Sequence, residues 1–360
     1  MPQDPFIFQG IQSYIQGPGT AERIGAYVSR MGTGHRTCIV ADRTILSLLE
    51  AVRKSMEEAG LEFRLHEFDG DLRRTRMEEL AARIGAECAP SVVLGVGGGK
   101  TIDAAKIIAN RLGARCAILA TSSSTDAAPS HAAVLVDEHH QISAEALPRN
   151  PDLVVVDSRI IASAPVRLFA SGIGDAISKK YEMNTAMRQG ERNVFGGRPV
   201  FFLHGMAEAL HDALLESGPE ACRSVQNGAV SDAVERVITS CVLLSCLIWE
   251  NGGLAGAHSI ANVLFNAGHG AKNLHGELVA FSLLVLLFLE ERAADLKELQ
   301  DFYRQIGLPR TIGDLGIPFD NQEGIRAICD AIHERYQKHN LPYSSPKIYE
   351  AIEQLHRGGS

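Results

Sequence analysis

The chain has 360 residues, and a chain of this length usually forms two domains, because a single hydrophobic core stops growing at about 250–300 residues. Its composition, 45% hydrophobic and 22% charged, is that of a globular protein and argues against a disordered or fibrous class. The formal net charge of -8 argues against nucleic acid as a partner, because phosphate backbones are bound by clustered Lys and Arg side chains.

The cysteine pattern and the apolar runs predict the compartment. The seven cysteines are an odd number without a close CxxC pair, and settings such as TCIVA around Cys38 are apolar, so we expect reduced thiols in a cytoplasmic protein. The N-terminal MPQDPFIFQG lacks the basic start and apolar stretch of a secretion signal. The longest apolar run, residues 278–289, is too short to span a bilayer, so no membrane association is expected.

The first half of the chain alternates short β-branched runs with helical patterns, which is typical of parallel βαβ units. Residues 45–59 and 76–87 place apolar residues three and four apart, as amphipathic helices do, and residues 134–147 can add a hairpin around a polar DEHH turn. The expected strands are TCIVA at 37–41, FRLHEF at 63–68, SVVLGVG at 91–97, CAILA at 116–120 and LVVVD at 153–157.

Beyond residue 157 the β-like runs end, and a Ser-Ala-Pro segment near residues 158–165 predicts a domain boundary. The fold class that we expect is therefore α/β: a Rossmann-like parallel-sheet domain over residues 1–160, followed by an all-helical domain over residues 161–360. The helices expected in the second half are 170–187, 200–216, 231–249 and 278–297.

A glycine-rich turn follows the third expected strand. GVGGGKTIDAAK places Gly97, Gly98 and Gly99 between a strand and a helix, where the free N–H groups and positive dipole of the helix start can hold a pyrophosphate. The spacing fits neither GxGxxG nor a Walker A loop, so an NTPase is not indicated. A tight turn without a ligand is the alternative.

Polar residues follow two other expected strands. Asp42 ends TCIVA, where a carboxylate can accept hydrogen bonds from an adenosine ribose and repel the 2′-phosphate of NADP, but capping of a helix near Thr44 fits equally well. The segment TSSSTDAAPS follows CAILA, so its Asp126 can accept a bond from a substrate hydroxyl, and a solvated loop is the alternative. The hydroxyls that can bond phosphate, ribose or nicotinamide are those of Thr121, Ser122, Ser124, Thr125 and Ser130.

Two histidines and an aspartate stand out in the helical half. His258 in GGLAGAHSIANVL and His275 in KNLHGELVAF have small or apolar neighbours, which predict burial. Their spacing matches neither HExxH nor a zinc finger, so a core histidine with one hydrogen bond is the default interpretation of each. Asp175, in SGIGDAISKKYE, is interpreted as a carboxylate at a helix start, where capping is the default role.

Five motifs together, in this order and spacing, resemble the glycerol dehydrogenases of the iron-type alcohol dehydrogenase superfamily. They are GVGGGKTIDAAK, SSSTDAAPS, ASGIGDAISKKYE, NGGLAGAHSIAN and NLHGELVAF. The resemblance begins at YIQGPGTAERIG and fades toward the C-terminus. It implies a dehydroquinate synthase-like fold, a small polyol or alcohol as substrate, and a homo-oligomer.

The resemblance also implies roles for the candidate residues. Asp175, His258 and His275 would be the ligands of one catalytic divalent metal, zinc in the glycerol dehydrogenase branch, with iron as the alternative. Asp126 would lie against the substrate. The implied NAD contacts are Asp42, Gly97, Gly98, Gly99, Lys100, Thr101, Thr121, Ser122, Ser124 and Ser130.

The sequence departs from the family pattern at three places. Where the family has a second histidine, in a pattern like AHxxHNG, this chain has Ala261, and Val136 replaces an expected tyrosine. The stretch before His275, which is aromatic or rich in histidine in the family, is GHGAKN here. These changes bear on the identity of the alcohol more than on the chemistry. We therefore expect an NAD-dependent, metal-assisted polyol dehydrogenase that transfers a hydride between a small diol and NAD.

Two other functions stay open at the level of sequence. An enzyme of the superfamily that acts on a phosphorylated polyol, or a cyclase, needs several basic residues near the metal, but Lys272 is the single Lys or Arg between residues 255 and 280. A catalytically disabled homologue that binds a metabolite would explain the changes near His258. The intact set of Asp175, His258 and His275 argues against it.

Overall fold

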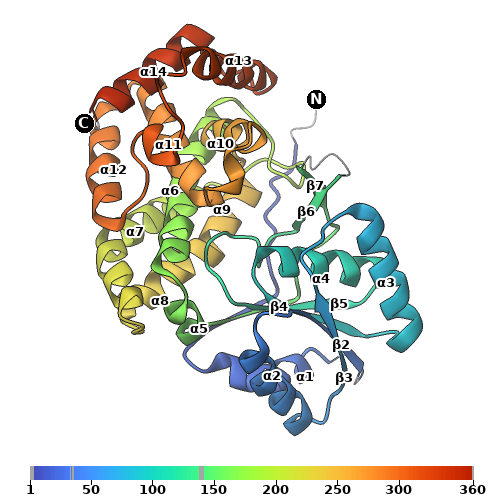
Figure 1. The fold of residues 1–360 in the computed structure, drawn as a ribbon. Helices are drawn as coiled ribbons and strands as arrows, with labels where there is room; N and C mark the ends of the chain where they lie inside the picture. The colour runs from blue at the N-terminus through green and yellow to red at the C-terminus, as the bar shows by residue number, and fades with distance from the viewer. Residues whose placement is uncertain (1–3, 33, 35, 138–141, 359–360) are drawn as a thin grey trace. The chain divides into compact units, whose positions relative to one another are not determined.

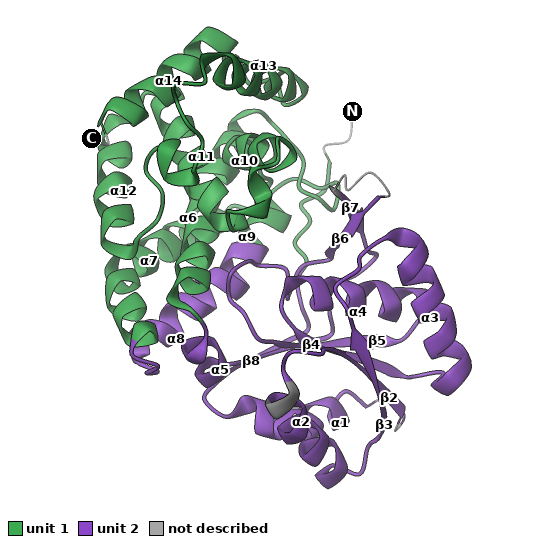
Figure 2. Cartoon of the chain, viewed as in Figure 1, with its two compact units in different colours: residues 1–9, 165–226, 247–360 green, residues 10–164, 227–246 purple. Residues whose placement is uncertain are grey.

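The structure is a computed structural model that describes residues 4–32, 34, 36–137 and 142–358 (Figure 1). The chain divides into two compact units, coloured separately in Figure 2. Unit 1 comprises residues 1–9, 165–226 and 247–360, and unit 2 comprises residues 10–164 and 227–246. Each unit therefore combines segments that are far apart in the sequence.

Unit 2 is built on a six-stranded sheet with the order β1-β8-β5-β4-β2-β3, in which every neighbouring pair is parallel. The core strands are buried on both faces, as parallel strands under βαβ crossovers are. The five expected strands and the Rossmann-like sheet are confirmed. They are β2 (Arg36–Asp42), β3 (Glu62–Phe68), β4 (Val92–Gly97), β5 (Arg115–Ala120) and β8 (Leu153–Asp157).

Two smaller β elements complete unit 2. The edge strand β1 (Ser13–Gly17) was not expected from the sequence, and it forms by pairing with β8, where Tyr14 lies opposite Val154. The expected hairpin is present as β6 (Ala132–Val136) and β7 (Ile142–Ala146), which pair antiparallel. Most of its DEHH turn lies outside the described residues.

Helices cover both faces of the sheet. Ile24, Val52 and Met56 from α1 and α2 pack in one core with Ile39 and Leu94 of the strands, and α3 and α4 lie on the opposite face (Figure 1). The helical elements of this half are η1 (Thr20–Arg23), α1 (Ile24–Ser29), α2 (Leu46–Glu58), α3 (Arg74–Cys88), α4 (Gly99–Leu112) and α5 (Ser158–Ser163).

Residues 227–246, from much later in the chain, add a second helical segment to unit 2. The helix expected at 231–249 consists of α8 (Asp232–Thr239), a π-helical turn η2 (Ser240–Leu244) and α9 (Ser245–Gly252). The chain passes into unit 1 within α9. Gln16 of β1 donates to the Glu235 carbonyl at 2.8 Å and accepts from Thr239 Oγ1 at 2.9 Å. These bonds attach α8 to the edge of the sheet.

Unit 1 is helical and surrounds α11 (His275–Leu289). This helix is apolar on all sides and almost wholly buried, as a central core helix is, and it packs against α6, α10, α12 and α14. The other helices of the unit are α6 (Val166–Arg188), α7 (Leu203–Gln226), α10 (Ala257–Asn266), η3 (His269–Ala271), α12 (Ala293–Ile306), η4 (Gly313–Leu315), α13 (Gln322–Lys338) and α14 (Ser345–Gly358).

In the described part of the chain, no single helix has both the length and the apolar character to cross a membrane. One pair of helices, Asp232–Gly252 and Ala257–Asn266, meets that test only when the two are joined across a bend of 104°.

The prediction of one helix over residues 278–297 is wrong. α11 ends at Leu289 and α12 begins at Ala293, and between them Glu291 adopts a left-handed backbone conformation with φ 57°. A non-glycine residue in this conformation ends a helix. The periodicity continued through the break because apolar residues lie on both sides of it.

Two glycines let α6 and α11 cross at close range. A Cβ atom at Gly276 would stand 1.8 Å from the Ser171 carbonyl oxygen, and one at Gly174 would stand 2.5 Å from the Gly276 oxygen. Because both obstacles are backbone atoms, neither can move aside by changing a rotamer. The first turn of α11 is thereby held against the first half of α6.

We expect Gly276→Ala to lower the free energy of unfolding by about 1–3 kcal/mol, because the added methyl group forces the two helices apart. Urea unfolding followed by circular dichroism measures the change. The matched control is Gly205→Ala in α7, where a Cβ would meet no atom within 4 Å; this variant should gain about 0.5–1 kcal/mol or stay neutral. Equal unfolding midpoints for the two variants would contradict the close crossing.

Candidate functional site

The carboxyl ends of three strands meet at one edge of the sheet in unit 2. Ala41 of β2 pairs with Val96 of β4, and Gly97 pairs with Ala120 of β5. The next residue, Thr121, donates its backbone N–H to the Gly97 carbonyl at 3.0 Å. The structure therefore brings together three segments that the sequence analysis singled out, those beginning at residues 42, 97 and 121.

The glycine-rich turn is shaped by two close contacts. A Cβ at Gly95 would stand 2.6 Å from Ala105 Cβ, and one at Gly97 would stand 2.7 Å from Thr101 Cβ. These glycines allow α4 to start directly beside the end of β4. The start of α4 therefore faces the same edge as the strand ends.

The next two glycines border open space. A Cβ at Gly98 would meet no atom within 4 Å, and one at Gly99 would meet only Thr125 Oγ1, at 4.0 Å. The first helical hydrogen bond of α4 runs from Ile102 N to Gly98 O, so the N–H groups of residues 99–101 precede the helical ladder. With the positive end of the helix dipole, this cradle suits a phosphate group.

Asp42 does not cap α2, whose N-cap is Ile45, but it makes local contacts in the turn after β2. Its Oδ1 accepts hydrogen bonds from Thr44 N at 2.8 Å and from Thr44 Oγ1 at 2.7 Å. Within the described residues, Oδ2 accepts no hydrogen bond. Asp42 thus stabilises the turn after β2 and still presents one oxygen at the edge where the strands end.

The hydroxyls of residues 121–130 lie in two settings. Ser122 donates to Ser124 Oγ at 2.9 Å, and both side chains are half-buried in the loop after β5. Ser130 is buried, and its hydroxyl donates to the Ala132 carbonyl at 3.1 Å. The Ser130 side chain therefore has a structural contact inside the loop.

A buried ion pair on α4, which the sequence analysis did not identify, holds this loop. Lys106 donates to the carbonyls of Ala127 at 2.9 Å and of Ala132, and it pairs with Asp103 at 2.9 Å. Asp103 in turn accepts from Val134 N at 3.1 Å. The DxxK spacing of TIDAAK was the available signal, since it puts both side chains on one face of the helix.

Ser245, also absent from the sequence-based candidates, contacts Asp126. The fully buried Ser245 hydroxyl donates to Asp126 Oδ2 at 2.7 Å, and it lies directly after the π-helical turn η2. Such turns are frequent at functional sites. Because the two residues are 119 positions apart, no local pattern could have linked them.

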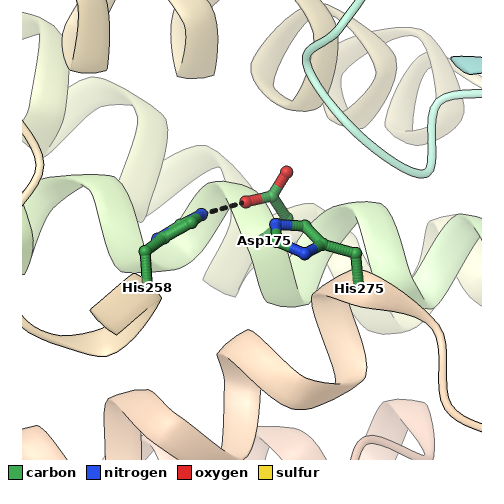
Figure 3. Close-up of side chains that lie close together, drawn as sticks. All are labelled: Asp175, His258 and His275. Carbon is green, nitrogen blue, oxygen red and sulfur yellow. Dashed lines mark hydrogen bonds and ion pairs between the residues drawn. The ribbon is translucent and has the colours of Figure 1, made fainter. Parts of the chain in front are cut away.

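In unit 1, Asp175, His258 and His275 come together (Figure 3). One ligand atom from each lies within 4.8 Å of the others, and His258 Nε2 is 3.2 Å from Asp175 Oδ1. The two imidazole ring centroids are 5.3 Å apart. Figure 3 shows the three side chains turned toward one another from three different helices.

The helices place these residues in different ways. His275 is the first residue of α11, and His258 lies in the first turn of α10, after Gly256. Asp175 lies in the interior of α6, which starts at Val166, so the interpretation of this carboxylate as a helix cap is wrong. Because α6 begins earlier than its periodicity suggested, Asp175 projects from the side of the helix.

Glu182 orients His258, a role that the sequence analysis missed. Glu182 is fully buried; its Oε1 accepts from His258 N at 2.9 Å, and its Oε2 lies 2.5 Å from His258 Nδ1. Because an ionised carboxylate only accepts hydrogen bonds, Nδ1 carries the hydrogen and Nε2 faces Asp175. The available signal was that Glu182 follows Asp175 by two helical turns.

The electrostatics of the cluster follow from burial and pairing. Burial would raise the pKa of Asp175, but the Lys179 ammonium and the His258 hydrogen bond hold that pKa well below its usual range. Burial would lower the pKa of His258, but the Glu182 carboxylate and the hydrogen bond that His258 donates to Asp175 raise it to about 9. Burial lowers the pKa of His275 to about 4. Two ionised carboxylates thus surround the imidazoles.

This donor set fits a divalent metal. One carboxylate and two imidazoles are ligands that zinc and iron both accept, and three protein ligands leave a position open for a further group. His258 also has the carboxylate partner on its second nitrogen that metal-bound histidines usually have.

A second group of potential metal ligands, Glu208, His211 and Asp212, is less suited to holding a metal ion. Its two carboxylates are exposed, Glu208 pairs with Lys180 at 2.6 Å, and His211 bonds to Tyr181 at 3.0 Å.

Comparisons with known proteins place the chain among alcohol dehydrogenases. Residues 12–158 match the model of the iron-containing alcohol dehydrogenase family. A glycerol dehydrogenase of Escherichia coli O6:H1 is 34% identical over 96% of this chain and 95% of its own length. A glycolaldehyde reductase of Halobacterium salinarum is 31% identical over 94% of this chain and 93% of its own. The crystal structure of glycerol dehydrogenase from Schizosaccharomyces pombe has a TM-score of 0.91 at 30% identity and covers 99% of this chain and 91% of that one.

We expect Glu182→Gln to weaken zinc binding about 10- to 100-fold, because the neutral amide orients His258 Nε2 less firmly and reduces its basicity. Competition with a chromogenic chelator measures the affinity. Glu290→Gln serves as control, since the Glu290 side chain is only 6% exposed, pairs with Arg188 and, among the described residues, makes no hydrogen bond or ion pair with Asp175, His258 or His275. Equal affinities for both variants would refute the orienting role.

Proposed function

The chain belongs to the glycerol dehydrogenase family of the iron-containing alcohol dehydrogenases, and on this premise we propose that it oxidises a small uncharged diol such as glycerol. Membership of the family makes it an NAD-dependent, metal-assisted alcohol dehydrogenase. The reaction removes a hydride from the carbinol carbon, which NAD accepts, and a proton from the hydroxyl, and it is reversible. The observation that carries the proposal is the convergence of Asp175, His258 and His275.

The three residues would hold one divalent ion, for which we propose zinc, with iron as the alternative. A set of one carboxylate and two imidazoles with an open position is typical of catalytic zinc. An ion bound there supplies Lewis acidity that lowers the pKa of the alcohol hydroxyl. Glu182 holds His258 in the orientation that this binding requires.

The sheet edge of unit 2 would bind NAD. The open cradle at Gly98 and Gly99, with the N–H groups of Lys100 and Thr101, suits the pyrophosphate, and the Oδ2 of Asp42 suits the adenosine ribose. We assign further cofactor contacts to Gly97, Thr121, Ser122, Ser124 and Ser130. Ser130 would contribute through loop shape, because its hydroxyl bonds to the Ala132 carbonyl.

Asp126 would accept a hydrogen bond from a substrate hydroxyl. Ser245 holds its Oδ2, so the carboxylate has a fixed position, and its charge disfavours an anionic substrate. Ala261, buried one helical turn after His258, is smaller than the family's histidine. The selectivity for glycerol over longer or more apolar diols should therefore be lower than in relatives that keep the histidine. Each lost polar contact removes about 1 kcal/mol of discrimination.

Two broader assignments belong to the same proposal. We assign NAD binding to residues 1–160 and metal and substrate binding to residues 161–360.

We also propose a cytoplasmic location, supported by the seven cysteines, which form no disulfide within the described residues and of which six are buried. Burial raises the pKa of Cys116, Cys222 and Cys329 to about 12, so these thiols stay protonated.

A homo-oligomer is supported by an exposed aromatic patch on unit 1. Phe201 is 87% exposed, its ring centroid lies 5.8 Å from that of Phe202, and Phe202 lies 5.2 Å from Phe8. Arg198 stacks over the exposed ring of Phe6 at 4.2 Å. Apolar patches of this kind usually become buried in an interface, and light scattering gives the number of subunits.

The purified, zinc-loaded chain should reduce NAD with glycerol, 1,2-propanediol and butanediols, and much less with hydroxy acids or phosphorylated polyols. His275→Ala should lower zinc occupancy at least tenfold and remove most of the activity, because a ligand is lost. Absorbance at 340 nm and metal analysis provide the two measurements. His204→Ala, an exposed histidine of α7, is the control.

Other results would favour the alternatives. Turnover of phosphorylated or carboxylated alcohols alone would contradict the substrate class. Full zinc occupancy without any NAD reduction would support a disabled, metabolite-binding homologue. Unchanged zinc occupancy and activity in His275→Ala would remove the metal assignment.

We expect NAD to be preferred over NADP, and Asp42→Ser to narrow that preference, because the Asp42 carboxylate repels a 2′-phosphate. Values of kcat/KM for both cofactors, with the same alcohol, measure the effect. Asp126→Asn is the control, since it also removes a carboxylate of unit 2 but should leave the cofactor ratio unchanged. A native preference for NADP would contradict this role of Asp42.

A further inference from the structure

A buried ammonium group lies inside the cluster of Asp175, His258 and His275. Lys179 follows Asp175 by one turn of α6, and its side chain is only 2% exposed. Its Nζ lies 2.7 Å from Asp175 Oδ1 and 3.2 Å from His258 Nε2. Lys179 is not among the proposed metal ligands and has no part in the proposed reaction.

The ammonium contacts two of the atoms that a metal would bind. Zinc lies about 2.0–2.2 Å from a carboxylate oxygen or an imidazole nitrogen. A metal would bind His258 through the single lone pair of Nε2, and this nitrogen lies 3.2 Å from the Lys179 ammonium. Metal and ammonium therefore compete for the space beside His258 Nε2.

The charges of the cluster also favour competition between Lys179 and a metal. Asp175 and Glu182 are two buried carboxylates, and a divalent ion alone would balance them. With the Lys179 ammonium retained, the same pocket carries an excess positive charge close to the ion. Coulomb repulsion at such distances is large where burial limits screening by water.

We propose that Lys179 is an internal cation that competes with the metal, which deepens the proposed metal centre and rests on it. Before a metal binds, the ammonium pairs the buried Asp175 carboxylate, which would otherwise be an uncompensated charge in the core. When a metal binds, Lys179 must move away from His258 Nε2. Lys179 thus stabilises the helical unit without metal and lowers the affinity of the centre for metal.

The test compares zinc binding by the full-length native protein and by Lys179→Met, which keeps the length of the side chain but removes the charge. In competition with a chromogenic chelator, Lys179→Met should bind zinc at least tenfold more tightly. After metal is stripped, the variant should unfold at a lower temperature than the native protein. Saturating zinc should narrow this difference.

Lys180→Met is the matched control, because Lys180 is the next residue of α6 and pairs instead with Glu208 at 2.6 Å. Its zinc affinity should equal the native value. If Lys179→Met does not fold without metal, Lys179→Gln gives the same comparison, since its amide can still donate to Asp175.

The outcomes separate this inference from the proposal beneath it. Native protein that binds zinc, with Lys179→Met and Lys179→Gln binding it equally or more weakly, overturns the competition while the metal centre stands. Native protein that binds no zinc in the competition assay overturns both. Tighter binding in Lys180→Met as well would show a general effect of positive charge and would also overturn the specific role of Lys179.

Discussion

The helical unit is organised by carboxylates that are buried on one face of α6. A charged group removed from water is tolerated only when it is paired, so Asp175 and Glu182 require cationic or hydrogen-bonding partners nearby. Those partners are Lys179 on the same helix and His258 at the start of α10. The glycine crossing of α6 with α11 then brings His275 to the same point. Local charge pairing and close backbone contact together determine where three helices meet.

Unit 2 also contains a buried charge that must be paired. There Lys106 is buried on α4, and it is paired with Asp103 and with carbonyl groups of residues 127–132. Because α4 also begins at the glycine-rich turn, one rigid helix links the proposed pyrophosphate site at its start to the loop that carries Asp126. A ligand at either place would therefore meet a surface that is already ordered, which reduces the entropy lost on binding.

Family membership establishes the class of reaction, whereas individual residues bear on which alcohol is used. Relatives over nearly the whole chain establish a metal-assisted, NAD-dependent dehydrogenase. The proposed preference among alcohols rests instead on single side chains, such as Ala261 one helical turn after His258, where the chain departs from the family pattern. In the same way, Lys179 affects how tightly a metal binds without altering which residues bind it. Small charge and volume changes around a retained ligand set can thus redirect an enzyme while its chemistry stays the same.

The sequence by itself determined the strands of the sheet core, the glycine-rich turn and the candidate ligands, because β-branched runs, glycine spacing and motifs are local signals. The edge strand β1 depends on pairing with β8, and the break at Glu291 depends on a single left-handed residue, so neither was predicted. The segment 227–246 looked like part of the helical half, yet it belongs to the compact unit of the sheet. Only the tertiary structure could place Glu182 against His258, Ser245 against Asp126, and Lys179 between Asp175 and His258. Most of these contacts join residues that are distant in the sequence. Even the local pair of Asp175 and Lys179 on α6 becomes part of a site only because α10 and α11 bring His258 and His275 to α6.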